Sequence, residues 1–320
     1  MKLKSLLIVS APLLALSACA GDGDGGTPES ARGDETMAAS EGAPAVAPIR
    51  VYAVNYPLAW FAEQIGGKEV RVELPVPADE DPAYWNPTPE QISEFQGADL
   101  ILLNGAGYAG WTERAALPPS KLVNTTRGMS DSYLRTEETV THTHGPEGEH
   151  EHGQLAFTTW LDPDFAVAQA SAIRDALVRE RPAESAAFDS AFAELEGDLV
   201  VLDSMLARAA ESLDEAPILG SHPVYQYLAA RYGLDLRSVH FEPDEIPAAT
   251  DWRELDRLQD ERPSTLMLWE AEPMPEIRQR LETEYGIRSV VFAPCANAPD
   301  VDDYMGIMRQ NAQRLSAMTE

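Results

Sequence analysis

The stretch AESAAFDSAFAELEGDLVVLDSMLARAAESL, residues 183–213, decides the fold of this chain. Its large apolar residues return every three or four positions and therefore share one face of a helix: Phe188, Phe192, Leu195, Leu199, Leu202, Leu206 and Leu213. Pro182 stands where such a helix would begin. At the usual rise per residue the helix would run about 45 Å, long enough to cross from one lobe of a protein to another.

Short apolar strands and helices alternate on both sides of this stretch. Before it, strands are predicted at 49–54, 70–76 and 99–103, and helices at 58–65, 90–96 and 162–179. After it, strands are predicted at 217–219, 236–239, 265–269 and 289–292, and helices at 224–232, 251–260, 275–285 and 302–318. Such alternation indicates an α/β fold. We expect an N-terminal lobe (49–182), a bridging helix (183–213) and a C-terminal lobe (214–320).

The amino-terminal end has the pattern of an export signal. Two lysines precede an apolar run over residues 6–16, which is too short to span a bilayer. The following Leu16-Ser17-Ala18-Cys19 resembles the lipobox of bacterial lipoproteins, which implies a signal peptide at 1–18 and lipid on Cys19. Residues 19–48 have almost no large apolar side chains, so we expect a disordered tether. The protein is expected outside the cytoplasm, anchored to the cell membrane or outer membrane and facing the periplasm or exterior.

Composition excludes some classes of function. The chain has 53 acidic and 24 basic residues, so nucleic acid, which requires a basic face, is not an expected partner. The negative charge fits a cationic ligand. No His-Glu-x-x-His and no Gly-x-Ser-x-Gly motif is present, so we expect no enzymatic activity. If Cys19 carries lipid, Cys295 has no partner for an intramolecular disulfide.

Four of the six histidines lie in one short segment, residues 142–153. They form two His-x-His pairs with acidic residues between them: His142, His144, His150 and His152. Such a tract is typical of metal chelation. Imidazole ligands favour Zn²⁺, with Mn²⁺ as the other candidate.

Several motifs, each weak alone, follow one another in a specific order. They are Tyr56-Pro57-Leu58, Asn86-Pro87-Thr88-Pro89, Asn104-Gly105-Ala106-Gly107, Trp160-Leu161-Asp162-Pro163 and Ser221-His222-Pro223. In this order the chain resembles the metal-specific solute-binding proteins of zinc and manganese ABC importers. The resemblance covers nearly all of residues 49–318 and implies two α/β lobes bridged by a rigid helix, with the metal in the cleft between them. It also implies an ABC permease and its ATPase as partners, and we expect a monomer.

The resemblance also implies a ligand set, which this chain keeps only in part. Family members usually use three His and one carboxylate, two ligands from each lobe. The two first-lobe positions fall on Ala83 and Thr158, which are not zinc ligands. The third falls on His222. The fourth should follow the strand 265–269, where Glu270 is favoured and Glu272 is second.

Two candidates remain for the missing donors. His240 follows another second-lobe strand, with Glu242 beside it to bind or to orient it, and the His tract precedes Thr158. Aromatic residues such as Tyr84 pack the lobes or wall the mouth of the cleft. The same fold binding a metal chelate, or no free metal, as an adhesin or scaffold lipoprotein is an alternative. A secreted zinc hydrolase is a further alternative, but the sequence lacks the catalytic motifs named above.

Overall fold

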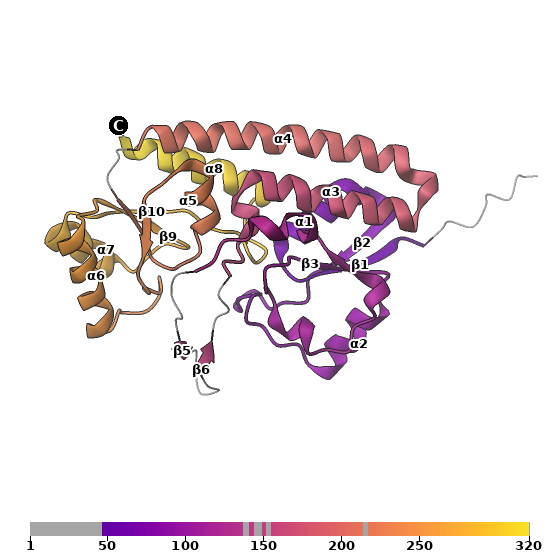
Figure 1. The fold of residues 1–320 in the computed structure, drawn as a ribbon, viewed down its shortest axis with the longest axis horizontal. Helices are drawn as coiled ribbons and strands as arrows, with labels where there is room; N and C mark the ends of the chain where they lie inside the picture. The colour runs from indigo at the N-terminus through magenta and orange to yellow at the C-terminus, as the bar shows by residue number, and fades with distance from the viewer. Residues whose placement is uncertain (1–46, 137–140, 144–148, 152–154, 214–216, 320) are drawn as a thin grey trace, which may run out of the picture. The chain divides into compact units, whose positions relative to one another are not determined.

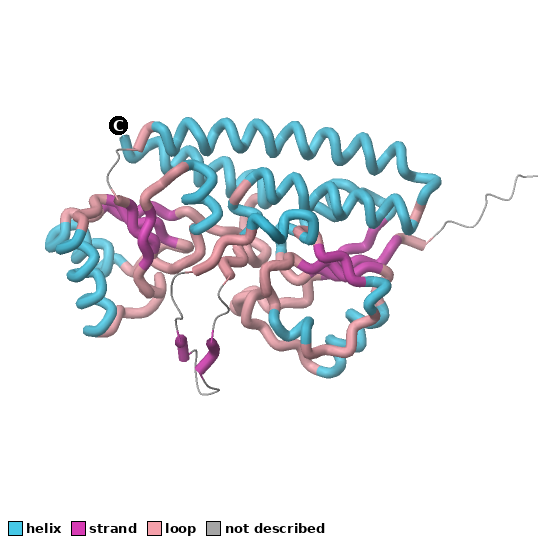
Figure 2. Tube along the Cα trace, viewed as in Figure 1, coloured by secondary structure: helices cyan, strands magenta, loops and turns pink. Residues whose placement is uncertain are grey.

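Two four-stranded parallel sheets organise the described part of the chain (Figures 1 and 2). The structure is a computed structural model that describes residues 47–136, 141–143, 149–151, 155–213 and 217–319. Cys19, the predicted signal peptide and nearly all of the predicted tether lie outside these residues. Val46–Glu320 forms one compact unit.

The first sheet has the order β2-β1-β3-β4, with every neighbouring pair parallel. Its strands are β1 (Ile49–Ala53), β2 (Val70–Glu73), β3 (Leu100–Leu103) and β4 (Leu122–Asn124). The apolar run of β3 is almost wholly buried, as expected for an inner strand of a parallel sheet. The helices α1 (Tyr56–Gly66) and α3 (Pro163–Glu180) cover one face, and Figure 1 shows α2 (Pro89–Gly97) on the other side.

Local signals in the sequence motifs start these helices. Asn55 caps α1 by accepting a hydrogen bond from the Leu58 amide at 3.3 Å. Thr88 and Gln91 form a capping box at the start of α2, within the Asn-Pro-Thr-Pro segment. Asp162 caps α3 immediately before Pro163. The motifs therefore fix helix starts as well as marking the family.

The second sheet has the order β10-β9-β7-β8 and is also parallel. Its strands are β7 (Ile218–Gly220), β8 (Leu236–Ser238), β9 (Leu266–Trp269) and β10 (Arg288–Val291). Its helices are α5 (Gln226–Tyr232), α6 (Ala249–Glu261), α7 (Pro275–Arg280) and α8 (Tyr304–Ser316). Alternate residues of β9 join different apolar clusters, Leu266 and Leu268 one and Met267 and Trp269 the other, because successive side chains point to opposite faces.

The helix α4 (Ser185–Glu211) bridges the two lobes and confirms the predicted bridging element. It packs against α1 and α3 of the first lobe and against α5 and α8 of the second (Figure 1). Leu195, Leu199, Leu202 and Leu206 on its inner face are buried. The guanidinium of Arg231 on α5 also holds α4, with Nη2 at 2.8 Å from Oδ2 of Asp203. Apolar packing and an ion pair thus both join the second lobe to α4.

The structure differs from the predicted elements in three places. The predicted helix 275–285 divides into α7 and one π-helical turn at Leu281–Tyr285. The short strand β4 was not predicted, and within the His-rich segment β5 (Thr141–Thr143) pairs antiparallel with β6 (Glu149–Glu151). Among the described residues, no helix has the length and apolar character needed to cross a membrane.

Candidate metal-binding site

Chemically reactive side chains gather where three strands of the second sheet end. His222 follows β7, His240 and Glu242 follow β8, and Glu270 follows β9 directly. Because β7 lies between β9 and β8, the segment that carries His222 lies between those that carry the two glutamates. Neighbouring strands are about 4.8 Å apart, which brings these side chains within reach of one another. The carboxyl edge of a parallel sheet is the usual place for a ligand.

His222 contacts both carboxylates. Its Nε2 lies 3.2 Å from Oε1 of Glu242, and its Nδ1 lies 3.0 Å from Oε1 of Glu270. The imidazole is largely buried, with 15% of its side chain exposed, while the two carboxylates are partly open to solvent. Burial opposes the charged form of His222, but the hydrogen bonds and charges of Glu242 and Glu270 outweigh it and raise its pKa to about 10. Without metal, His222 is therefore a cation held between two anions.

His240 lies beside this cluster. Its ring centroid is 5.8 Å from that of His222, with the rings inclined at 68°. Backbone hydrogen bonds from Val239 to Gly220 (3.0 Å) and from Phe241 to Ser221 (2.8 Å) fix the His240 segment against the β7 segment. A side chain at Gly220 would put its Cβ 2.9 Å from the carbonyl oxygen of His222, so glycine permits this close approach.

Of the other predicted donors, the structure places Glu272 and the backbone of His142 and His150. Glu272 forms an ion pair with Arg278, and 63% of its side chain is exposed. His142 and His150 are backbone partners in the β5–β6 pairing. His144 and His152 lie outside the described residues. The structure thus brings Glu270 and His240 to His222 and separates Glu272 from it.

In the described part of the first lobe, Thr158 rather than an imidazole contacts the His222 loop. Ala83 and Thr158, at the positions of the expected first-lobe ligands, are both buried. The hydroxyl of Thr158 donates to the carbonyl oxygen of Val224 at 2.5 Å, so it joins the lobes. The side-chain amide of Asn104, which directly follows β3, donates to the carbonyl oxygen of Phe157 at 2.8 Å. This hydrogen bond holds the residue before Thr158 in place.

An acidic and aromatic turn completes the surroundings. Oδ1 of Asp81 accepts from the Ala83 amide at 2.8 Å, and the Asp81 carbonyl oxygen accepts from the Tyr84 and Trp85 amides. Burial, and then the charges of Asp81, Glu270 and Glu242, raise the pKa of Tyr84. The Tyr84 hydroxyl therefore senses the charges of both second-lobe carboxylates. Sequence reasoning identified Tyr84 only as a packing or wall residue and gave Asp81 no role.

The side chains of His222, Glu242 and Glu270 are suitable zinc ligands, but in the observed arrangement they do not point to one common position. Imidazole nitrogen and carboxylate oxygen are ordinary zinc ligands. Among the described residues, no three His, Cys, Asp or Glu side chains are arranged to hold one metal ion together. The reason is visible in the ion pairs: His222 uses both ring nitrogens on Glu242 and Glu270. A metal would need His222 to release at least one of these contacts and to lose its proton.

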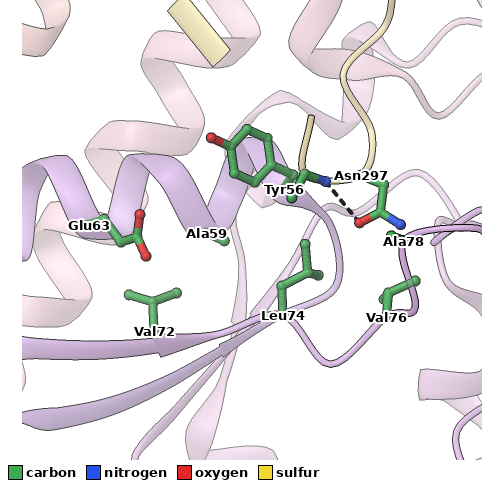
Figure 3. Close-up of a pocket in the computed structure, with 9 residues that line it drawn as sticks. Tyr56, Ala59, Glu63, Val72, Leu74, Val76, Ala78 and Asn297 are labelled. Carbon is green, nitrogen blue, oxygen red and sulfur yellow. Dashed lines mark hydrogen bonds between the residues drawn. The ribbon is translucent and has the colours of Figure 1, made fainter. Parts of the chain in front are cut away.

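A separate cavity of about 230 Å³ lies against the first sheet. Figure 3 shows Tyr56 and Glu63 of α1 opposite Val72 and Leu74, with Asn297 of the second lobe at one end. Its lining is mostly apolar and includes one carboxylate, no imidazole and no thiol. The chemistry of its lining therefore does not suit a zinc ion, and we assign the candidate site to His222.

Comparisons with known proteins identify the family of the chain. The chain is 25% identical to the high-affinity zinc uptake system protein ZnuA of Bacillus subtilis, over 98% of this chain and 97% of that protein. It is 24% identical to the zinc-binding lipoprotein AdcA of Streptococcus pneumoniae serotype 4, over 85% of this chain. The chain spans 56% of the length of that AdcA.

The fold also has solved counterparts. The crystal structure of the Zn(II)-bound ZnuA-like domain of Streptococcus pneumoniae AdcA matches with a TM-score of 0.72, at 21% identity, covering 85% of this chain and 99% of that one. This likeness establishes the two-lobed α/β fold. The family model described as zinc-uptake complex component A, periplasmic, matches residues 51–318. The chain belongs to this family of periplasmic zinc-uptake components.

Proposed function

We propose that the protein captures a divalent metal ion, zinc in the first place, outside the cytoplasm and delivers it to an ABC importer. The observation that carries this proposal is His222 held between Glu242 and Glu270 at the carboxyl edge of the second sheet. A zinc-uptake family that spans residues 51–318 supports the same cargo. Mn²⁺ is the second candidate, because carboxylate oxygens also suit it.

His222 and Glu270 are the proposed principal ligands. Glu242 lies 3.2 Å from His222, against 3.0 Å for Glu270, and is the proposed third donor. Among the described side chains His240 supplies a further imidazole. We propose that His142, His144, His150 and His152 collect metal near the site and can donate a ligand to it. Glu272 is the weakest of the predicted donors because it is paired with Arg278.

Capture then consists of an exchange of cations. In the metal-free protein the imidazolium of His222 neutralises part of the charge of the two carboxylates. An arriving zinc ion takes over that role, and His222, once deprotonated, becomes a ligand instead of a counterion. Because Glu242 and Glu270 are partly exposed, the ion can reach them before His222 rearranges.

The test of the site is a competitive zinc titration with a matched pair of variants. Glu270→Gln should weaken zinc binding by at least about tenfold, since an amide oxygen is a much poorer zinc ligand than a carboxylate. Glu272→Gln, the same change two residues away, should leave affinity unchanged, and His222→Ala should abolish the principal site. Equal effects of the two glutamate changes, or full affinity in His222→Ala, would overturn the assignment.

The anchor is proposed from the lipobox alone. Lipid on Cys19 and a tether over residues 19–48 would hold the folded part, from residue 49 onward, at the membrane surface. Cys19→Ala should move the protein from the membrane fraction to the soluble fraction of cells. A protein that is soluble before the substitution would rule the anchor out.

The partners follow from the family. We propose an ABC permease and its ATPase as the receiving machinery and a monomer as the binding unit. Deletion of the gene should reduce growth in zinc-depleted medium, and added zinc should restore it. If deletion instead changes only attachment to host or matrix proteins, the adhesin alternative is favoured.

A further inference from the structure

Four aromatic rings line the first lobe next to the positions where its metal ligands are missing. They are Tyr84, Phe157, Tyr108 and Trp160, called here the aromatic wall. Tyr84 and Phe157 have ring centroids 6.2 Å apart, Phe157 and Tyr108 5.3 Å, and Tyr108 and Trp160 5.6 Å, each pair edge to face. Tyr84 and Phe157 are the immediate neighbours of Ala83 and Thr158. This chain thus has aromatic rings where imidazoles would be expected, and two of them, Tyr84 and Phe157, are at least partly exposed.

The aromatic wall lies beside the candidate site. Thr158, next to Phe157, donates its hydroxyl hydrogen to Val224, two residues after His222. Tyr84 responds to the charges of Glu270 and Glu242 and is the most open ring of the wall, at 38% exposure. A molecule bound at the two carboxylates would therefore lie within reach of Tyr84.

The loop that carries Tyr108 is held in an unusual conformation. Gly105, Ala106, Gly107 and Ala109 all have positive φ angles, between 52° and 83°. For the two alanines this conformation is unfavourable, and such local strain is concentrated at binding sites. The hydroxyl of Tyr108 is buried without a hydrogen-bond partner among the described residues, which costs about 1–3 kcal/mol. Burial, and then the charge of Asp81, raise the pKa of Tyr108, so its hydroxyl keeps its proton and can donate a hydrogen bond.

The second lobe alone cannot complete a four-coordinate shell around zinc in the observed arrangement, because no three donors converge. We propose that the cargo arrives as a zinc chelate of a small bidentate amino acid, whose organic part packs on the aromatic wall. His222 and either Glu270 or Glu242 then supply two donors, and the amine and carboxylate of the chelator supply the other two. This inference rests on the proposed zinc-binding function and names the form in which the metal is bound.

Physical chemistry favours such a ligand at this wall. A chelating amino acid with an aromatic or imidazole side chain presents a flat ring that can stack on Tyr84, a contact of about 0.5–1.5 kcal/mol. The oxygen of its carboxylate that does not bind zinc can accept a hydrogen bond, and the Tyr108 hydroxyl in the wall is a buried donor without a partner among the described residues. A bare zinc ion gains neither contact. The wall therefore distinguishes a chelate from the free ion.

The experiment is equilibrium dialysis of the metal-free protein with zinc and radiolabelled L-histidine, together and separately. With both present, the protein should retain about one labelled histidine for each zinc in the principal site, as a ternary complex requires. Without zinc no label should be retained. Zinc retained without label would overturn the proposal but leave the proposed zinc-binding function intact. No zinc retained under any condition would overturn both.

Variants separate the wall from the metal donors. Tyr84→Ala should lower histidine retention by about tenfold, the upper range for one aromatic contact, with zinc binding in the absence of histidine unchanged. Tyr84→Phe keeps the ring and should retain the label. The matched control is Tyr285→Ala, a half-buried tyrosine that stacks on Trp252 and precedes β10, at the opposite edge of the second sheet. Equal losses in Tyr84→Ala and Tyr285→Ala would contradict a role of the wall.

Discussion

Among single residues, His222 determines how the site responds to pH. Its pKa in the folded protein is raised from 6.5 to about 10. A raised pKa means that the ion pairs with Glu242 and Glu270 stabilise the metal-free fold fully below pH 6.5, and that this contribution is lost as pH rises toward 10. We therefore expect the free energy of unfolding of the metal-free protein to decline from about pH 6.5 to pH 9, measured by urea denaturation.

The pKa of His222 also predicts how zinc affinity depends on pH, and the direction is opposite to that of the unfolding free energy. Because zinc must displace the His222 proton, affinity should rise with pH over the range in which the folding contribution declines. With an unperturbed histidine the zinc affinity would stop rising above about pH 6.5, whereas the two carboxylates extend the rise toward pH 10. The control is His222→Ala, in which the decline in unfolding free energy should be shallower. If the unfolding free energy declines equally steeply with pH in the wild type and in the variant, His222 is not the group that titrates.

Among the elements, α4 offers a test of what joins the lobes. Leu202 is buried and Val201 next to it has 52% of its surface exposed, although both lie in the middle of the same helix. Leu202→Ala should lower the free energy of unfolding by about 2–5 kcal/mol, because it leaves a cavity under the helix. Val201→Ala should change it by less than about 0.5 kcal/mol. Chemical denaturation of the two variants side by side gives both values.

The outcome also bears on how the lobes unfold. If α4 packs on both lobes as described, Leu202→Ala should shift a single cooperative transition. Two separate transitions in the variant, with only one shifted, would mean that the helix belongs energetically to one lobe.

For the whole molecule, the contribution of the His-rich segment, residues 142–153, can be tested by deletion. Deleting His142 to Gly153 should remove weak zinc sites and also reduce affinity at the principal site. The segment precedes Thr158 by only a few residues, which gives its imidazoles an effective concentration in the millimolar range at the site. Zinc titration of the deletion variant and of His240→Ala distinguishes the two sources of a further imidazole. Unchanged affinity for the first zinc in the deletion variant would limit the segment to collecting metal.

Sequence alone determined the elements and the class of fold. Periodicity and capping signals are local properties, so the bridging helix and the alternation of strands and helices could be predicted from residues near one another in the chain. The strand β4 was missed because its three residues carry too little pattern. The π-helical turn after α7 was missed because it keeps an apolar spacing similar to that of an α-helix.

The candidate site was predicted only in part for a different reason. The motif around His222 and the strand before Glu270 pointed to those two residues, with Glu270 favoured over Glu272. The sequence linked Glu242 to His240 and not to His222, and it gave Tyr84 only a packing or wall role. Tertiary structure decided this: the order β9-β7-β8 puts His222 between Glu270 and Glu242, while Arg278 takes Glu272. Which strands are neighbours depends on packing across the whole lobe, so residues 20 or more positions apart meet in a way that no short stretch of sequence encodes.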